Sequence, residues 1–122
     1  MNAKELVSEY MRTVWVEKNV PAIERFVDAN LIQHNPNLPN GRDALAAFVP
    51  GLFNEMPNLQ WRILRIIAEG DMVVVHSHAV PAPDARGTMV VDLFRVADGR
   101  IVEHWDVTQP VPESSASGNA MD

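Results

Sequence analysis

Residues 92–109 read DLFRVADGRIVEHWDVTQ, two apolar segments that flank an Asp-Gly pair. An Asp-Gly pair between alternating apolar residues is a strong short-range signal for a β-hairpin. Side chains two residues apart along a strand point to the same face, so His104 and Asp106 share one face of the second arm. Ionisable groups on an apolar face cost free energy unless they line a wet cavity or a functional site. The stretch therefore predicts a sheet and the position of a site within it.

The register of this hairpin depends on its turn. A two-residue turn at 98–99 leaves Asp92 on the face away from His104. A three-residue loop over 97–99, closed by a bulge, places Asp92 opposite His104. We expect the bulged loop, because it gathers both residues with Asp106 on one face.

Composition and charge indicate a soluble globular domain. Of the 122 residues, 47% are hydrophobic and 21% are charged, which is ordinary for a folded protein. With 10 Lys and Arg against 16 Asp and Glu, the net charge is -6, so nucleic acid and anionic membrane are not expected as partners. There is no cysteine, and no apolar run approaches the ~18 residues of a membrane span. We expect a cytoplasmic protein without disulfides or cysteine metal sites.

Apolar periodicity changes near the middle of the chain from a helical to a strand pattern. Helices are expected over residues 2–18, 21–30 and from about residue 40 to 56, with Asn40 capping the third helix and Pro50 kinking or dividing it. A short strand is expected over 31–34 and longer strands over 59–69, 72–81, 87–96 and 100–109. Short links between the longer strands imply antiparallel neighbours.

The predicted fold class is α+β. Three N-terminal helices pack on one side of a curved antiparallel sheet and leave a central conical pocket, where a ligand is expected to bind. Residues 1–112 form this single domain, and the small, polar residues 113–122 are expected to be a flexible C-terminal tail.

The histidines supply candidate ligand-binding groups. His76 and His78 share one strand face, as in a His-x-His metal site or as hydrogen-bond partners of a ligand. Their spacing from Gly70 also echoes a cupin motif, but the Glu that this motif expects does not follow. We expect these two residues to contact a substrate rather than a metal. His34 and Asn35 end a strand at the expected pocket mouth and are further candidates, with turn chemistry as the alternative.

Aromatic residues complete the predicted pocket. Tyr10 and Trp15 lie at helical spacing, which most often marks core residues, and we place both against the pocket together with Phe94. Tyr10 is the one phenol in the chain and therefore a candidate proton donor. Trp61 and Trp105 fall on the outward faces of their strands, where aromatic residues favour a homodimer interface on the convex side of the sheet.

Three stretches resemble the SnoaL-like family of the nuclear transport factor 2-like superfamily: residues 92–109, LIQHNP at 31–36 and GDMVVVHSH at 70–78. The resemblance extends over residues 3–112. It implies a cystatin-like α+β cone. It implies less about activity, because the superfamily includes isomerases, dehydratases, polyketide cyclases, epoxide hydrolases and non-catalytic binding proteins.

The resemblance also assigns roles to single positions. In ketosteroid isomerase relatives, a protonated Asp on the third long strand donates a hydrogen bond to an oxyanion, and Asp92 matches that position. Their general base is an Asp before a Pro, whereas here Asn35 precedes Pro36, and an amide takes no proton. An Asp on the last strand acts as acid or base in SnoaL-like cyclases and epoxide hydrolases, and Asp106 matches it. The Arg-x-Asp pair that epoxide hydrolysis also needs is absent from the third strand.

We therefore expect a cofactor-independent enzyme of the lyase or isomerase type. It would perform acid–base chemistry, such as aldol-type cyclisation, isomerisation or dehydration, on a small, apolar, oxygenated carbonyl compound. Asp106 or His104 would move the proton, while Asp92, His76 or His78 would polarise the carbonyl. Two alternatives remain open: a non-catalytic binding module or dimeric scaffold, and a metal enzyme built on the His-x-His pair.

Overall fold

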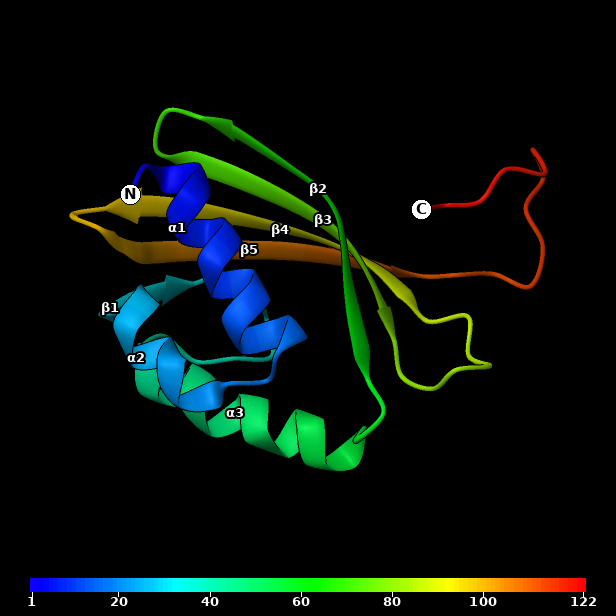
Figure 1. Ribbon diagram of the computed structural model, residues 1–122, viewed down its shortest axis with the longest axis horizontal. Coiled ribbons are helices and arrows are strands. Elements are labelled where there is room, and N and C mark those ends of the chain that lie inside the picture. The colour runs from blue at the N-terminus through cyan, green and yellow to red at the C-terminus, as the bar shows by residue number, and fades with distance from the viewer.

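The computed structural model describes residues 1–122, in which short helices and one strand precede a meander of four long strands (Figure 1). The helical elements are α1 (Ala3–Tyr10), the π-helix η1 (Met11–Val16), the 3-10 turn η2 (Val20–Ala22), α2 (Ile23–Phe26) and α3 (Arg42–Glu55). The strands are β1 (Val27–Gln33), β2 (Gln60–Glu69), β3 (Met72–Val80), β4 (Thr88–Ala97) and β5 (Arg100–Pro110). The predicted α+β class is confirmed.

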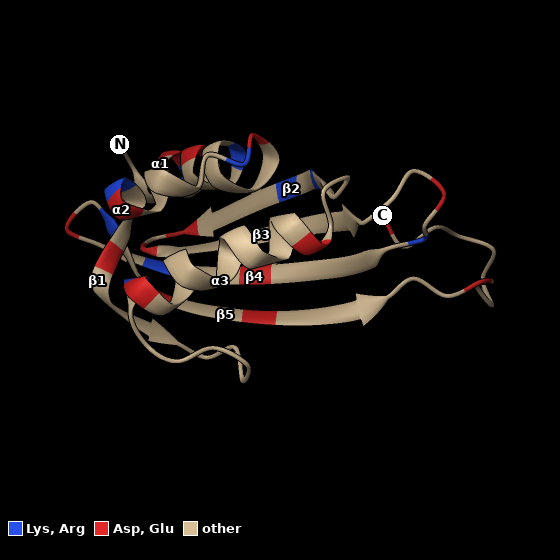
Figure 2. Cartoon of the chain, turned by 90° about the horizontal axis from the view of Figure 1, so that it is seen from below, with Lys and Arg blue, Asp and Glu red and all other residues tan.

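A single five-stranded sheet, in the order β1-β5-β4-β3-β2, curves around the helices. β2 to β5 are antiparallel neighbours, but β1 runs parallel to β5, so the sheet is mixed rather than wholly antiparallel. Figure 1 shows the helices on the concave side of the sheet. Figure 2 shows α3 in front of the sheet and acidic positions midway along β4 and β5. Asp92, the one acidic residue of β4, is buried.

α1 begins with a capping box. The Asn2 side chain accepts a hydrogen bond from the Glu5 N–H at 2.8 Å, and the Glu5 carboxylate accepts one from the Asn2 N–H at 3.2 Å. The helix predicted over 2–18 runs to Val16, and its last six residues form a π-helix. Its inner face packs into the main core with residues Leu6, Val7, Tyr10, Met11 and Val14.

The second helix is shorter than its predicted range of 21–30. α2 ends at Phe26, and Val27 already pairs with Ile101 of β5. This pairing joins residues far apart in the sequence, and it overrides a local pattern that favours helix.

The third helix begins at Arg42, so the prediction that Asn40 caps it was wrong. The Asn40 carboxamide oxygen instead accepts a hydrogen bond from the Gln33 N–H at 2.9 Å, which ties the loop to the end of β1. Pro50 lies inside α3 without dividing it. None of the helices is long and apolar enough to cross a membrane.

The β4–β5 hairpin closes with a two-residue turn at Asp98 and Gly99. Their φ angles of 52° and 73° are both positive, as a type I′ turn requires, and Ala97 pairs with Arg100. The prediction of a bulged loop over 97–99 was therefore wrong. The type I′ turn is favoured because its twist matches that of the flanking strands, and Asp tolerates the left-handed region better than most residues.

A bulge lies instead within β5. Val102 has no partner in β4, because the register shifts shortly after the turn. One extra residue inverts the alternation of side chains along the strand. Asp92 consequently pairs with Asp106 on the concave face, and His104 lies beside them. The three groups still gather on one face, by a different backbone feature from the one expected.

Candidate active site

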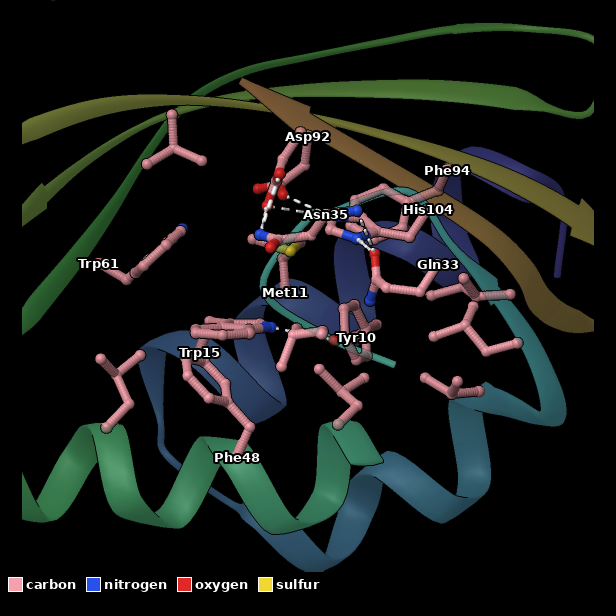
Figure 3. A pocket seen from close by; sticks show the side chains of 18 of the residues that line it. Tyr10, Met11, Trp15, Gln33, Asn35, Phe48, Trp61, Asp92, Phe94 and His104 are labelled. Atoms are coloured by element: carbon pink, nitrogen blue, oxygen red, sulfur yellow. Dashed lines mark hydrogen bonds and ion pairs between the residues drawn. The ribbon is translucent and has the colours of Figure 1, made fainter. Parts of the chain in front are cut away.

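A cavity of about 140 Å³ lies between the helices and the concave face of the sheet (Figure 3). Thirteen of its 19 lining residues are hydrophobic, among them Met11 and Trp15 of η1, Phe48 and Leu52 of α3, and Phe94 of β4. An apolar cavity of about 150 Å³ holds benzene. The cavity therefore has room for a ligand of single-ring size.

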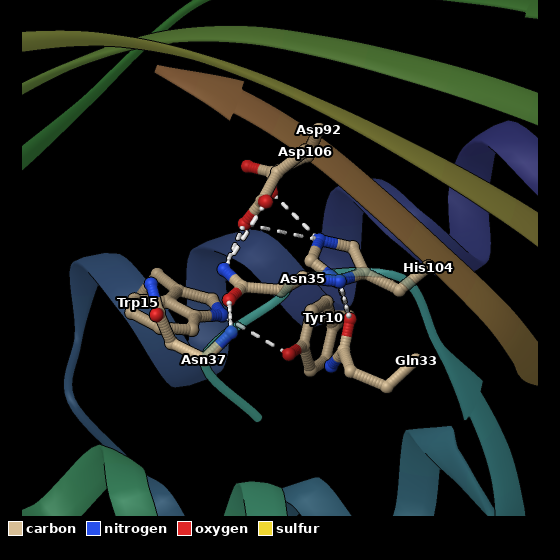
Figure 4. A network of polar contacts seen from close by, with 8 residues as sticks. All are labelled: Tyr10, Trp15, Gln33, Asn35, Asn37, Asp92, His104 and Asp106. Carbon is tan, nitrogen blue, oxygen red and sulfur yellow. Dashed lines mark hydrogen bonds and ion pairs between the residues drawn. The ribbon is translucent and has the colours of Figure 1, made fainter. Parts of the chain in front are cut away.

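Asp92 and His104 form a hydrogen-bonded pair at one end of the cavity (Figure 4). Asp92 Oδ1 lies 2.8 Å from His104 Nε2, and the two side chains are only 9% and 14% exposed. Burial raises the pKa of Asp92 above its usual value. The hydrogen bond from His104 opposes this rise in pKa, and the nearby Asp106 adds to it. The net direction of the pKa is upwards, so the Asp92 carboxyl keeps its proton to a higher pH than an exposed Asp does.

Gln33 determines where His104 carries its protons. The Asn35 backbone N–H lies 3.1 Å from one atom of the Gln33 carboxamide and can only donate, so that atom is the oxygen. The same oxygen lies 2.7 Å from His104 Nδ1, which must therefore be protonated. We infer that one further proton is shared between His104 Nε2 and Asp92 Oδ1. The pair holds it either as a neutral acid and imidazole or as a carboxylate and imidazolium.

Asp106 is held from the other side by Asn35. The Asn35 amide nitrogen donates to both oxygens of Asp106, at 2.9 and 3.1 Å. Its orientation is fixed because the Asn37 N–H donates to the Asn35 oxygen at 2.8 Å. Asp106 Oδ2 lies 4.0 Å from His104 Nε2, and the Asp106 side chain is 15% exposed. A positioned carboxylate thus stands beside a pair that shares a proton.

Tyr10 lies on the opposite, helical side of the cavity. Its hydroxyl oxygen accepts a hydrogen bond from Trp15 Nε1 at 3.1 Å, so its own proton is free to be donated elsewhere. Burial raises the pKa of Tyr10 well above its usual range, and the charge of Asp92 adds to the rise, so the phenol keeps its proton. In an α-helix, residues five apart are separated by about 140° around the axis. The wider π-turn brings Trp15 back towards Tyr10.

Seven of the ten predicted site residues line the cavity: Tyr10, Trp15, Asn35, Asp92, Phe94, His104 and Asp106. His34, His76 and His78 do not, and the expectation that they face the pocket was wrong. The His76 ring contacts Arg65 at 2.6 Å, and His78 Nε2 lies 2.7 Å from the Arg86 carbonyl oxygen. The reason is register: Val75 pairs with Asp92, so even-numbered positions of β3 lie on the convex face.

His34 belongs to a cluster outside the cavity. Its ring stacks on Trp105 with centroids 4.8 Å apart, and its Nε2 lies 2.7 Å from Glu103 Oε2. Hydrogen bonds from His34 and then Arg95 lower the pKa of Glu103. The sequence pattern placed His34 at the end of a strand but not on a face, because the irregular pairing of β1 was not foreseen.

Gln33 and Trp61 are among the cavity residues that the sequence analysis did not place there. Gln33 precedes His34 and shares a face with Leu31, an apolar cavity residue, which is the signal that could have found it. Trp61 lines the cavity, and its predicted outward position was wrong. It alternates with Leu59, which is buried, and that spacing indicated an inward position.

Asp92, His104 and Asp106 are also the one group whose potential metal-binding atoms lie within 4.8 Å of one another. Their hydrogen bonds do not suit a cation. His104 Nε2 and Asp92 Oδ1 share a proton, and the Asn35 amide directs N–H groups at both Asp106 oxygens. The arrangement fits proton transfer better than metal ligation.

Known structures share this architecture. A SnoaL-like protein of unknown function from Burkholderia thailandensis E264 superimposes with a TM-score of 0.73 at 16% identity, covering 88% of this chain and 94% of that chain. TsrD from Streptomyces laurentii gives 0.72 at 18% identity, covering 87% of both chains. A protein classed provisionally as a SnoaL-like polyketide cyclase from Jannaschia sp. CCS1 gives 0.73 at 23% identity, covering 88% of this chain and 85% of that chain. At these identities the likeness establishes the fold alone.

The sequence itself carries the family assignment. A comparison with curated protein sequences finds no match. The model of the SnoaL-like domain, however, matches residues 7–104, which is most of the chain. The resemblance to the SnoaL-like family seen in the sequence is therefore confirmed, and the chain belongs to the SnoaL-like family.

Proposed function

We propose that this protein is a cofactor-independent enzyme that moves a proton next to the carbonyl group of a small apolar compound. The observation that carries this proposal is the 2.8 Å contact between Asp92 Oδ1 and His104 Nε2 beside the carboxylate of Asp106, at one end of an apolar cavity. Perturbed, mutually close ionisable groups in a cavity are typical of catalytic sites.

The hydrogen bonds suggest a separate role for each group. Asp106 has free lone pairs and faces the cavity, so it takes the proton from the carbon next to the carbonyl. The Asp92–His104 pair supplies its shared proton to the oxygen on which negative charge develops. The Tyr10 hydroxyl, which its raised pKa keeps protonated, is a second donor to that oxygen. Return of the Asp106 proton to a different carbon, with the oxygen-bound proton going back to the Asp92–His104 pair, completes an isomerisation. Attack of the enol carbon on a second carbonyl, whose oxygen takes the Asp106 proton while the enol proton goes back to the pair, completes an aldol-type cyclisation.

Exchange of deuterium into a simple ring ketone tests the proposal without knowledge of the natural substrate. Cyclohexanone fits the cavity volume, and its α-protons are followed by proton NMR in D2O. We expect the protein to accelerate exchange over buffer and Asp106→Asn to remove at least about 100-fold of the acceleration, a typical effect of a general base. His76→Gln, on the convex face, is the matched control and should exchange at the wild-type rate.

A non-catalytic binding module is the competing function. The two acids of the site have partners without a ligand, Asp92 in His104 and Asp106 in Asn35, and such pairing is compatible with a passive pocket. Binding of cyclohexanone without any exchange, at the same affinity in Asp106→Asn, would establish that function instead.

We also propose that two copies pair through the convex face of the sheet. One row of apolar side chains crosses four strands there: Ile67, Val74, Leu93 and Trp105 are successive cross-strand partners. Val107 continues the face and is 65% exposed. Exposed apolar surface of this kind marks an interaction site. Val107→Lys should shift the protein from dimer to monomer in sedimentation equilibrium, whereas Val16→Lys, at the end of η1, should not.

A further inference from the structure

Trp61 presents a hydrogen-bond donor to the cavity that nothing in the protein uses. Its Nε1 atom is buried and has no hydrogen-bond partner, although the ring lines the cavity. Figure 3 shows the nitrogen edge of this ring turned towards the cavity interior. An indole N–H can only donate, and a buried donor without an acceptor is unfavourable. The group is therefore suited to a ligand that brings an acceptor.

The Trp61 ring is held in place by its neighbours. Its centroid lies 4.8 Å from that of Trp15, and Trp15 is itself fixed by its hydrogen bond to Tyr10 and by an edge contact with Phe53. The N–H direction is thus set before a ligand arrives. A donor fixed in this way discriminates between ligands, because little ordering is needed when the hydrogen bond forms.

A buried water is a poor partner for this donor. Such waters make about three hydrogen bonds. Trp61 packs against a hydrophobic cluster of Leu59, Ala79 and Val90, as do Leu52, Phe53 and Met56. Water beside Trp61 would therefore find one donor and few further partners among these side chains, whereas a ligand oxygen arrives with the rest of its molecule packed against them.

Trp61 and the Asp92–His104 pair approach the cavity from different directions. β2 is separated from β4 by β3, and Trp61 pairs with Ala79, four residues along β3 from Val75, the partner of Asp92. A single ligand oxygen is not expected to serve both ends. We propose that the ligand carries a second oxygen acceptor, at the far end of its ring from the reacting carbonyl, and that Trp61 Nε1–H binds it.

The inference rests on the proposed function for the position of the reacting carbonyl, and it makes Trp61 the residue that selects ligands oxygenated at both ends. Two matched probes distinguish a ligand with oxygen at both ends from a ligand with oxygen at one end. Cyclohexane-1,4-dione has an oxygen at each end of one ring, and cyclohexanone has only one. Equilibrium binding of both probes is measured, so the result does not depend on catalysis.

The protein's three tryptophans allow a direct readout by NMR of the 15N-labelled indole groups. The Trp61 signal is assigned by its loss in Trp61→Phe. We expect cyclohexane-1,4-dione to move the Trp61 indole proton downfield, as a new hydrogen bond does, and cyclohexanone to leave it nearly in place. Trp105, outside the cavity, serves as the internal reference.

Affinities measured with the variants complete the test. Trp61→Phe should weaken dione binding by roughly three- to tenfold, the worth of one net hydrogen bond, and leave cyclohexanone binding unchanged. Trp105→Phe should alter neither. Equal effects on both probes, an unmoved Trp61 signal, or failure of either ring to bind at its solubility limit would overturn the inference. If the wild-type protein did not accelerate deuterium exchange but the dione still shifted the Trp61 signal, the proposed function alone would be refuted.

Discussion

Gln33→Leu is expected to lower the free energy of unfolding by about 2–4 kcal/mol. The Gln33 oxygen accepts hydrogen bonds from His104 Nδ1 at 2.7 Å and from the Asn35 N–H at 3.1 Å. Leu has a similar size and no polar atom, so both donors lose their acceptor. Each orphaned donor costs about 1–3 kcal/mol, and the lower part of the summed range applies because both hydrogen bonds are only partly buried.

Urea denaturation followed by circular dichroism at pH 7 measures this loss. For a chain of this length, the change corresponds to a fall in Tm of roughly 10 °C. Gln33→Glu keeps an oxygen for both donors and should be clearly more stable than Gln33→Leu. Gln60→Leu is the matched control, because Gln60 is exposed, and it should change stability by less than about 0.5 kcal/mol.

The refuting result is equal stability of Gln33→Leu and Gln60→Leu. In that case the Gln33 oxygen does not hold the imidazole of His104, and the protonation of Nδ1 is no longer determined. The shared proton between His104 and Asp92 would then lose its structural support.

Three further outcomes follow from the same contacts. Asp92→Asn should be more stable than wild type at pH 8 and lose that advantage as the pH falls towards 4. The pKa of Asp92 is higher in the folded than in the unfolded protein, so the stability of the wild type declines as the pH rises above the unfolded-state pKa of 3.8. Urea titrations from pH 4 to 8 would show or exclude this difference. Asn2→Ala should lower the free energy of unfolding by about 1 kcal/mol, because it removes the capping box. An unchanged free energy of unfolding in the same assay would show that the cap does not stabilise the protein. Deletion of Val102 removes the one unpaired residue and leaves Asp92 paired with Asp106 on the concave face, so the deleted protein should still bind cyclohexanone; loss of binding would contradict the assignment of Val102 as the bulge.

Strand alternation predicted which residues share a face, but it left open which face is concave. His76 and His78 are correctly grouped, yet they lie outside the cavity. Their position depends on the pairing of Val75 with Asp92, and the link over 81–87 carries no signal for that register. A slip of one residue would have brought both histidines inside. Which residues of a strand face the cavity therefore depends on a long-range pairing that the sequence of that strand alone does not determine.

The hairpin shows the same limit at closer range. Asp98-Gly99 correctly predicted a turn, but the three-residue bulged loop expected there was wrong, and Asp92, His104 and Asp106 share a face for another reason. The bulge was expected in the loop and lies at Val102, within a run of residues that all suit a regular strand. Its position is set by packing of β5 between β4 and the parallel strand β1, a contact that joins distant parts of the chain.

The sequence predicted an apolar cavity between the helices and the sheet, but it identified only some of the residues that line the cavity. Tyr10 and Trp15 were recovered because helical periodicity places them on the inner face. The hydrogen bond between them depends on the π-turn, which periodicity does not reveal. Gln33 was missed because its role comes from its acceptor oxygen meeting two donors, one of them on β5.

The proton between Asp92 and His104 is the feature on which the proposed chemistry depends most. It is tested by the 15N spectrum of the protein labelled at histidine, with His104 assigned by its loss in His104→Gln. We predict a protonated Nδ1, and an Nε2 whose chemical shift lies between the protonated and free values and moves in Asp92→Asn. A fully deprotonated Nδ1, or an Nε2 signal indifferent to Asp92→Asn, would contradict the shared proton and the acid–base role built on it.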